Sequence, residues 1–251
     1  MPEETDALLG SSRRSRSASL SHYLRDEIDT RHSHWILLVC YVITGLLDSS
    51  AVLIWGSFVS MQTGNSVYFG LGLVGPSDDR WIKSGVSIAG FCLGSFVFST
   101  LHRLFPPRHR WVLMSSFLIQ VVCIGIAASI VTIYRPTRDT PLGWLVLLPL
   151  VLVSAQSSGQ AVASRVLRCN GLTSVVLTSV YCDLFSHPDL VVLGDAEGLR
   201  RAAAITCLMF GTVLGGLWAH SSVGMMGALW MAAVLKALII FTWFGWKKKQ
   251  L

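Results

Sequence analysis

Charged residues are scarce in this sequence of 251 residues: Asp, Glu, Lys and Arg make up 14% of it, whereas hydrophobic residues make up 52%. A soluble domain of this length needs more charged surface and shorter apolar runs. The composition therefore excludes a soluble globular protein and predicts an all-α integral membrane protein, whose direct partner is the lipid bilayer. The net charge of +6 does not predict nucleic-acid binding, because the basic residues cluster in the N-terminal tail, one short loop and the C-terminus.

Catalytic and metal-binding motifs are also lacking. The sequence contains no G-x-S-x-G, H-E-x-x-H or Walker A string, and we therefore expect no enzymatic activity. The six cysteines occur singly, mostly in apolar segments, and no C-x-x-C pair is present. They are typical of small buried hydrophobic side chains, so we expect no disulfide framework, no metal site and no cofactor.

The two ends of the chain are polar. Residues 1–33 combine arginine, serine and acidic residues without apolar periodicity, which predicts a disordered cytoplasmic tail and no signal peptide. The transmembrane domain is expected over residues 34–246, and residues 247–251 form a basic cytoplasmic C-terminus.

Two short strings near the ends resemble sorting signals. Glu4-x-x-x-Leu8-Leu9 fits an acidic dileucine signal, and Lys248-Lys249 fits a dilysine retrieval signal. They favour an endomembrane or vacuolar membrane, with the plasma membrane as the alternative.

Long apolar runs dominate the rest of the chain. A helix needs about 20 apolar residues to cross the bilayer core. Six stretches meet this criterion: Trp35–Trp55, Ile82–Leu101, Trp111–Tyr134, Leu142–Ala163, Arg201–His220 and Val223–Trp246. Two further apolar segments, Ser57–Val74 and Thr173–Leu193, are interrupted by polar residues or glycine. Irregular backbone is tolerated in a membrane only where protein or a water-filled cavity satisfies it, so we predict two broken or re-entrant segments beside six transmembrane helices.

The alternative is that both interrupted segments cross fully, which gives eight spans. Six spans place both termini, the Leu101–Arg110 loop and the Arg165–Arg201 segment on one face, which then holds most of the basic residues. Eight spans would move the Arg103–Arg110 cluster to the other face. The positive-inside rule therefore favours six spans with both termini in the cytoplasm.

The order of span, broken segment, span and span occurs twice, over about 35–134 and 142–246. A unit with three full crossings is inverted when it is repeated, so the order predicts an inverted 3+3 repeat. The second span of each unit has a small-residue face, formed by Gly90-x-x-x-Gly94 and by Gly211-x-x-x-Gly215. Such faces allow helix backbones to approach closely, either within the chain or in a homo-oligomer.

Four motifs together carry a resemblance to a known family: Gly45-Leu46-Leu47-Asp48, Met61-Gln62-Thr63-Gly64-Asn65, Gly159-Gln160 and Leu177-Thr178-Ser179-Val180-Tyr181-Cys182-Asp183-Leu184. In this order they resemble the YoaK-like membrane family, a domain of unknown function, and the tail Val180-Tyr181-Cys182-Asp183-Leu184 of the last motif is similar to its fungal branch. The resemblance implies an integral membrane protein of about six spans and brings no established activity or ligand. Bacterial members usually read Met-Thr-Gly-Asn without Gln62, and carry Gly where this chain has Ser179.

Two charged residues lie deep inside predicted spans, away from the ends. Asp48 is in the middle of the first, where an ionised carboxylate costs roughly 2.5–3.5 kcal/mol, so it should face the interior. It could couple proton or cation movement to a solute, or it could be neutral or hydrogen-bonded to a helix neighbour. Lys236 is the only lysine deep in an apolar run. We expect it to reach the nearer membrane face with its long stem, or to pair with Asp48 or Asp183.

The candidate substrate-binding residues are polar residues and a glycine in or near the breaks: Asp48, Gln62, Thr63, Gly64, Asn65, Gln160, Thr178, Ser179 and Asp183. Their amide and hydroxyl groups, with the half-helix ends, could bind a small polar solute. Alternatively they only cap broken helices and join spans. We expect a carrier or channel-like protein, against the alternative of a membrane scaffold or regulatory protein. A water-accessible Asn65 favours the carrier, and a dry, packed Asn65 favours the scaffold.

Overall fold

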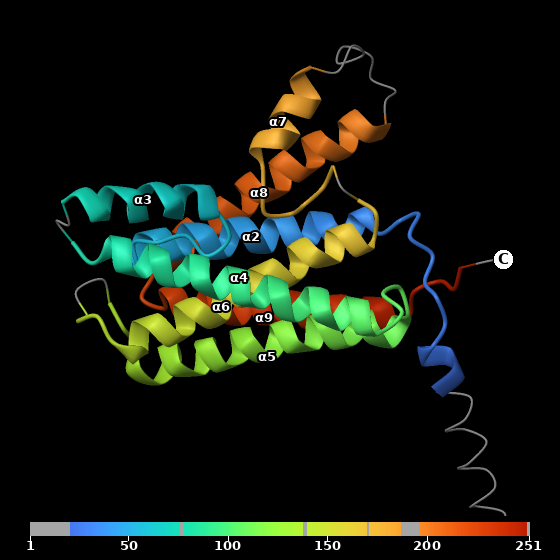
Figure 1. The fold of residues 1–251 in the computed structure, drawn as a ribbon, viewed down its shortest axis with the longest axis horizontal. Coiled ribbons are helices and arrows are strands. Elements are labelled where there is room, and N and C mark those ends of the chain that lie inside the picture. Colours follow the sequence, from blue (N-terminus) through green and yellow to red (C-terminus); the bar gives the residue numbers. More distant parts are fainter. Residues whose placement is uncertain (1–20, 76–77, 138–139, 170, 187–195, 250–251) are drawn as a thin grey trace, which may run out of the picture.

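Six helices in the part of the chain that the structure describes are long and apolar enough to cross a membrane (Figure 1). The computed structural model describes residues 21–75, 78–137, 140–169, 171–186 and 196–249. Within these ranges the regular structure is helical, with two isolated β-bridges. The prediction of an all-α protein with six membrane-spanning helices is confirmed.

The long helices are α2 (His34–Ile54), α4 (Arg80–Leu104), α5 (Arg110–Tyr134), α6 (Trp144–Val166), α8 (Ala196–His220) and α9 (Met225–Phe244). Two of these helices, α4 and α5, end shortly before a proline. The residue before a proline is disfavoured in a helix. Accordingly, Phe105 before Pro106 is extended after α4, and Arg135 before Pro136 is left-handed after α5.

Two shorter helices, α3 (Gln62–Val74) and α7 (Thr178–Phe185), occupy the segments that were predicted to be broken. With 13 and 8 residues they are too short to cross a bilayer, which needs about 20 residues. The eight-span alternative is therefore wrong. In Figure 1 the chain leaves the C-terminal end of α2 and turns back to the middle of the bundle. Helix α3 then runs from there toward the end of the bundle at which α2 finishes. Gly56, with a φ of 79°, permits the reversal.

The long helices pack mainly in pairs: α2 with α8, α4 with α6, and α5 with α9. The small-residue faces lie in two of these contacts. A Cβ added to Gly94 would lie 2.7 Å from Cα of Ala155 on α6, and one added to Gly211 would lie 2.9 Å from the carbonyl carbon of Val42 on α2. Both faces are therefore occupied within the chain, and the expected homo-oligomer would have to use another surface.

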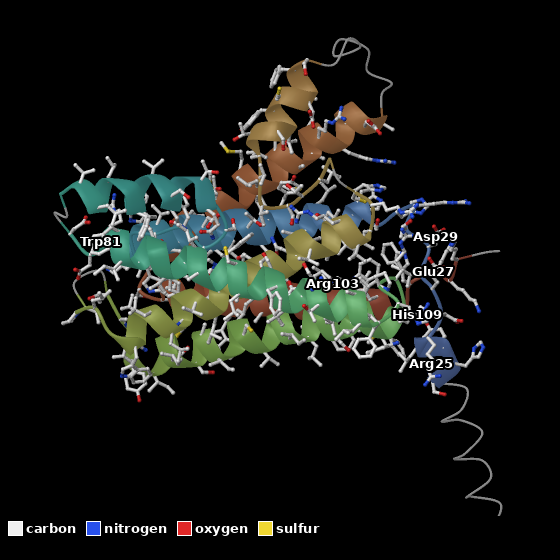
Figure 2. All side chains as sticks on the ribbon, in the orientation of Figure 1. Arg25, Glu27, Asp29, Trp81, Arg103 and His109 are labelled. Carbon is white, nitrogen blue, oxygen red and sulfur yellow. The ribbon has the colours of Figure 1, made fainter. Side chains whose placement is uncertain are left out.

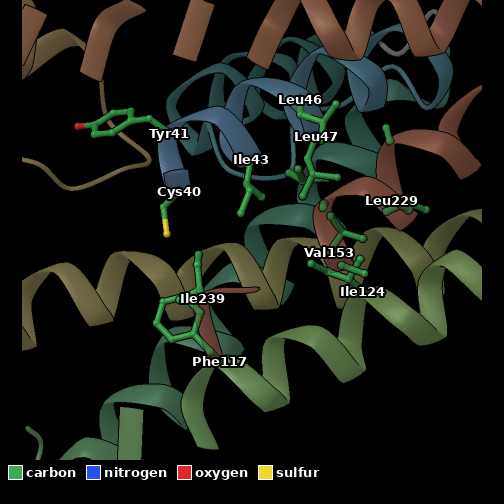
Figure 3. Close-up of a cluster of buried hydrophobic side chains, with 14 of the residues drawn as sticks. Cys40, Tyr41, Ile43, Leu46, Leu47, Phe117, Ile124, Val153, Leu229 and Ile239 are labelled. Atoms are coloured by element: carbon green, nitrogen blue, oxygen red, sulfur yellow. The ribbon is translucent and has the colours of Figure 1, made fainter. Parts of the chain in front are cut away.

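Helix α2 lies at the centre of the bundle. Figure 3 shows its residues Cys40, Ile43, Leu46 and Leu47 in a buried cluster with residues of α5, α6 and α9, namely Phe117, Ile124, Val153, Leu229 and Ile239. Because α2 is surrounded by protein, polar side chains on it can bind neighbouring segments instead of facing lipid.

Residues 21–29 contact both the loop before α5 and the C-terminus; these three segments (21–29, 105–110 and 244–249) are called the terminal clasp. Its centre is Arg110, which is fully buried. The Arg110 guanidinium lies 3.8 Å above the Tyr23 ring and donates to the Trp246 carbonyl at 2.6 Å. Residues 21–29, which belong to the tail expected to be disordered, are therefore held by contacts with the rest of the protein. Residues 1–20, including the predicted dileucine signal, lie outside the described residues.

Ion pairs complete the terminal clasp. Asp26 pairs with Lys248 at 2.7 Å, and Glu27 pairs with Lys249 at 3.2 Å and with Arg108 at 3.5 Å. The hydrogen bond from Lys248 holds the pKa of the Asp26 carboxyl below its ordinary value of 3.8. Both lysines of the predicted dilysine signal are thus paired with acidic residues near the other end of the chain.

Candidate functional site

The first broken segment is held by Asp48, which is buried on α2. Its Oδ1 accepts hydrogen bonds from the backbone N–H of Val59 at 2.8 Å and of Ser60 at 2.9 Å. Its Oδ2 accepts one from the Ser60 hydroxyl. The carboxylate therefore satisfies N–H groups that an irregular backbone leaves without partners, and it fixes the point at which α3 begins.

Asn65, in the first turn of α3, is fully buried. Its Oδ1 accepts from the Ser57 hydroxyl and the Phe58 N–H, each at 3.0 Å. Its Nδ2 donates to the Phe58 carbonyl at 2.8 Å and lies 2.9 Å from Gln62 Oε1 and 3.1 Å from the Ser87 hydroxyl. Asn65 is therefore dry, which favours a structural role for this residue.

The second broken segment is held by Thr44, one helical turn before Asp48. Thr44 Oγ1 donates to the Ser174 carbonyl at 2.6 Å and accepts from Gln160 Nε2, also at 2.6 Å. Gln160 is buried on α6. Residues four apart share one face of a helix. A single face of α2 therefore positions both broken segments.

A cavity of about 840 Å³ lies between these segments. Its wall includes residues 60–64 of the first segment and residues 175–178 of the second. Helices α4 and α6 contribute Phe91, Ser95, Ser99, His102 and Arg103, and Ala161, Val162, Arg165 and Val166. Cavities of about 300–1,000 Å³ are the usual size of small-molecule sites.

The cavity extends from the breaks toward the end of the bundle that carries the terminal clasp, because Arg103 and Pro107 also line it. Figure 2 shows Arg103 on the side of Glu27, His109 and Arg25, whereas Trp81 lies at the opposite end of α4.

The structure divides the predicted site residues into three groups. Gln62, Thr63, Gly64 and Thr178 line the cavity. Three others, Asp48, Asn65 and Gln160, are buried outside its wall, where they hold the breaks and neighbouring helices in place. Ser179 and Asp183 are exposed on α7 and do not line the cavity either.

Sequence reasoning missed the contribution of α4. Ser95, Ser99, His102 and Arg103 recur at helical spacing and form a polar stripe on the C-terminal half of α4. That spacing is present in the sequence, but Arg103 also fits the positive-inside pattern and so does not by itself indicate a site.

A family model described as "Protein of unknown function (DUF1275)" matches residues 36–242. The chain belongs to this family. The match includes both broken segments and every helix that lines the cavity. No curated protein and no solved structure matches the chain. Family membership supports a polytopic membrane protein, and the roles of individual residues rest on the structure.

In this member of the DUF1275 family, Lys236 makes neither of the contacts that the sequence suggested. It is fully buried on α9, where Nζ donates to Gln156 Oε1 of α6 at 2.5 Å and to Gln120 Oε1 of α5. The expectations that it reaches the membrane face, or pairs with an aspartate, are both wrong. The two amide oxygens offer partners inside the bundle, so the amine joins three helices.

The end of α3 contains a glycine motif. Gly70, Gly72 and Gly75 form a G-x-G-x-x-G string, which marks a dinucleotide site only between a strand and a helix. Here it lies at the C-terminal end of α3, and the described residues include no strand. Gly72 instead makes room for the Trp81 side chain. The described residues also contain no cluster of three or more His, Cys, Asp or Glu side chains that could hold a metal ion.

Proposed function

We propose that the protein is a carrier or channel-like protein for a small polar solute, and that the cavity between the broken segments is its solute site. One observation carries the proposal: residues of both breaks line the same cavity. Transporters commonly place their solute sites where broken helices meet near the middle of the membrane.

The pairing of helices supports this proposal. In an inverted 3+3 repeat, α2 corresponds to α6, α4 to α8 and α5 to α9. Exchange of the halves then converts the α2–α8 contact into the α6–α4 contact and leaves the α5–α9 contact unchanged, and these are the three most extensive contacts. This pattern is expected of an inverted repeat, and in carriers of that architecture the two halves rock against each other around the solute site.

The side from which solute enters follows from the basic residues. Arg103, Arg108, Arg110 and Lys247–Lys249 lie at the clasp end of the bundle, and the positive-inside rule assigns such an end to the cytoplasm. The proposed cavity therefore opens toward the cytoplasm, with α3 between it and the other side. An endomembrane or vacuolar location, absence of enzymatic activity and a place in the YoaK-like, fungal-type branch remain predictions from the sequence.

The alternative function is a membrane scaffold or regulator without transport. The dry environment of Asn65 and the hydrogen-bonded state of Asp48 favour it, because both residues act here as structural supports. The cavity favours the carrier, since a scaffold has no need of a space of about 840 Å³ lined by Gln62, Thr63 and Thr178.

An uptake comparison tests the proposed function. Vesicles with and without the full chain are incubated with a mixture of small metabolites, and their contents are compared by mass spectrometry. We expect at least one polar solute to accumulate only with the protein. The double variant Ser95→Trp and Ser99→Trp, which places two indoles in the cavity, should lose this uptake.

The matched control is Leu93→Trp with Phe96→Trp, because both side chains are exposed on the same helix outside the cavity. This variant should transport normally. Absence of any protein-dependent solute, or equal uptake by the two tryptophan variants at equal amounts of folded protein, would favour the scaffold.

A further inference from the structure

We propose that the solute is a small oxyanion, that is, a molecule with a carboxylate or phosphate group. This inference rests on the proposed solute site and adds its chemical class. Three features of the cavity wall favour negative charge: two helix N-termini, two arginines without a carboxylate partner among the described residues, and a buried histidine whose ring nitrogens form no hydrogen bond of normal geometry with those residues.

Helices α3 and α7 both begin at the cavity. Neither has a side-chain cap at its N-terminus. The backbone N–H groups of Thr63 and Gly64 find no acceptor among the described residues. A helix N-terminus carries partial positive charge and unsatisfied N–H groups, which together favour a bound anion.

The charged side chains of the wall are all basic. Arg103 and Arg165 line the cavity, and neither forms an ion pair with a described residue. Arg103 donates to the Thr100 hydroxyl at 3.1 Å and Arg165 to the Ala161 carbonyl at 3.2 Å, which leaves further N–H groups on each guanidinium. No aspartate or glutamate belongs to the described wall.

His102 provides an independent observation. Its side chain lines the cavity and is only 5% exposed. Neither ring nitrogen forms a hydrogen bond of normal geometry with the described residues, although the Pro107 carbonyl is close by. An imidazole carries at least one N–H in either protonation state, and a buried donor without a partner is costly. An oxyanion in the cavity would supply the missing acceptor.

Arginine near the cytoplasmic end of a helix is ordinary and needs no ligand to explain it. Arg108 is such a residue, because it pairs with Glu27 at 3.5 Å. Arg103 and Arg165 differ from it in position, since they share one cavity with His102 and with the starts of α3 and α7.

Binding can be tested without transport. The purified full chain is placed in nanodiscs of neutral phosphatidylcholine, and its thermal midpoint is measured with succinate, inorganic phosphate or the uncharged succinamide. Both anions should raise the midpoint and succinamide should not. Arg103→Gln and Arg165→Gln should each weaken the apparent anion affinity about tenfold. Arg25→Gln removes the same charge from an exposed site outside the cavity and should leave the affinity unchanged.

The outcomes separate the class of solute from the function. Equal shifts with succinate and succinamide would overturn the anion class and leave a carrier of polar solutes intact. Absence of a shift with either anion, or equal weakening by Arg25→Gln and Arg103→Gln, would overturn the inference. Nanodiscs that contain phosphatidylserine test whether the bound oxyanion belongs to a lipid headgroup. If only these stabilise the protein, the oxyanion is a lipid headgroup, and the proposed transport of a soluble molecule fails.

Discussion

Asp48→Ala should destabilise the protein by roughly 3 kcal/mol or more, because three buried donors lose their acceptor and each such loss costs about 1–3 kcal/mol. These donors are the N–H groups of Val59 and Ser60 and the Ser60 hydroxyl. Without these three hydrogen bonds the start of α3 is no longer held against α2. The measurement is the free energy of unfolding in detergent, compared with that of the unmodified chain.

Asp48→Asn is the matched control. Its amide oxygen can still accept from both N–H groups, and its NH₂ can donate to the Ser60 hydroxyl once that hydroxyl rotates. We expect this variant to lose about 1 kcal/mol or less and to retain uptake. A stable Asp48→Ala variant would contradict the supporting role. A folded Asp48→Asn variant without uptake would instead restore the hypothesis that Asp48 couples ion movement to the solute.

The second large effect is expected at Gly215, where α8 crosses α2. A Cβ at this position would lie 3.0 Å from the carbonyl carbon of Leu46 and would also collide with the Leu46 carbonyl oxygen and the Ser49 hydroxyl. Backbone cannot move aside as a side chain can. Gly215→Leu should therefore force the two helices apart and cost about 3 kcal/mol or more.

Gly216 is the neighbouring residue and supplies the control, because a Cβ there meets nothing within 4 Å. Gly216→Leu should be neutral or stabilise α8 by about 0.5–1 kcal/mol through its better helix propensity. Both variants are compared by unfolding in the same detergent. Equal stability of the two would show that α8 does not approach α2 through this face.

The long helices could be predicted from the sequence, because about 20 apolar residues in a row have few alternatives to crossing a bilayer. The breaks could also be predicted from the sequence, because the polar residues Thr63 and Asn65 interrupt an apolar run of this kind. The terminal clasp was not predictable. Its contacts join residues such as Asp26 and Lys248, which are polar, lie at opposite ends of the chain and show no periodicity.

The site was predicted only in part. Sequence identifies polar residues in a break, but the direction of each side chain depends on packing that no local pattern contains. Thr63 and Asn65 are two positions apart on α3, and one lines the cavity while the other is buried against Phe58. Lys236 shows the same limit, because its partners Gln120 and Gln156 come from two other helices.

The central claim is that a water-filled cavity reaches the first break from the cytoplasmic end. Its most direct test is the labelling of a single cysteine at Thr63, in a variant without the six native cysteines, by a membrane-impermeant maleimide. We predict rapid labelling of Thr63→Cys from the side that bears the terminal clasp and none from the other side. Val67→Cys, exposed on the same helix but outside the cavity, should resist labelling because it faces lipid. If Thr63→Cys stays unlabelled from both sides, or reacts only from the side opposite the clasp, the claim is contradicted.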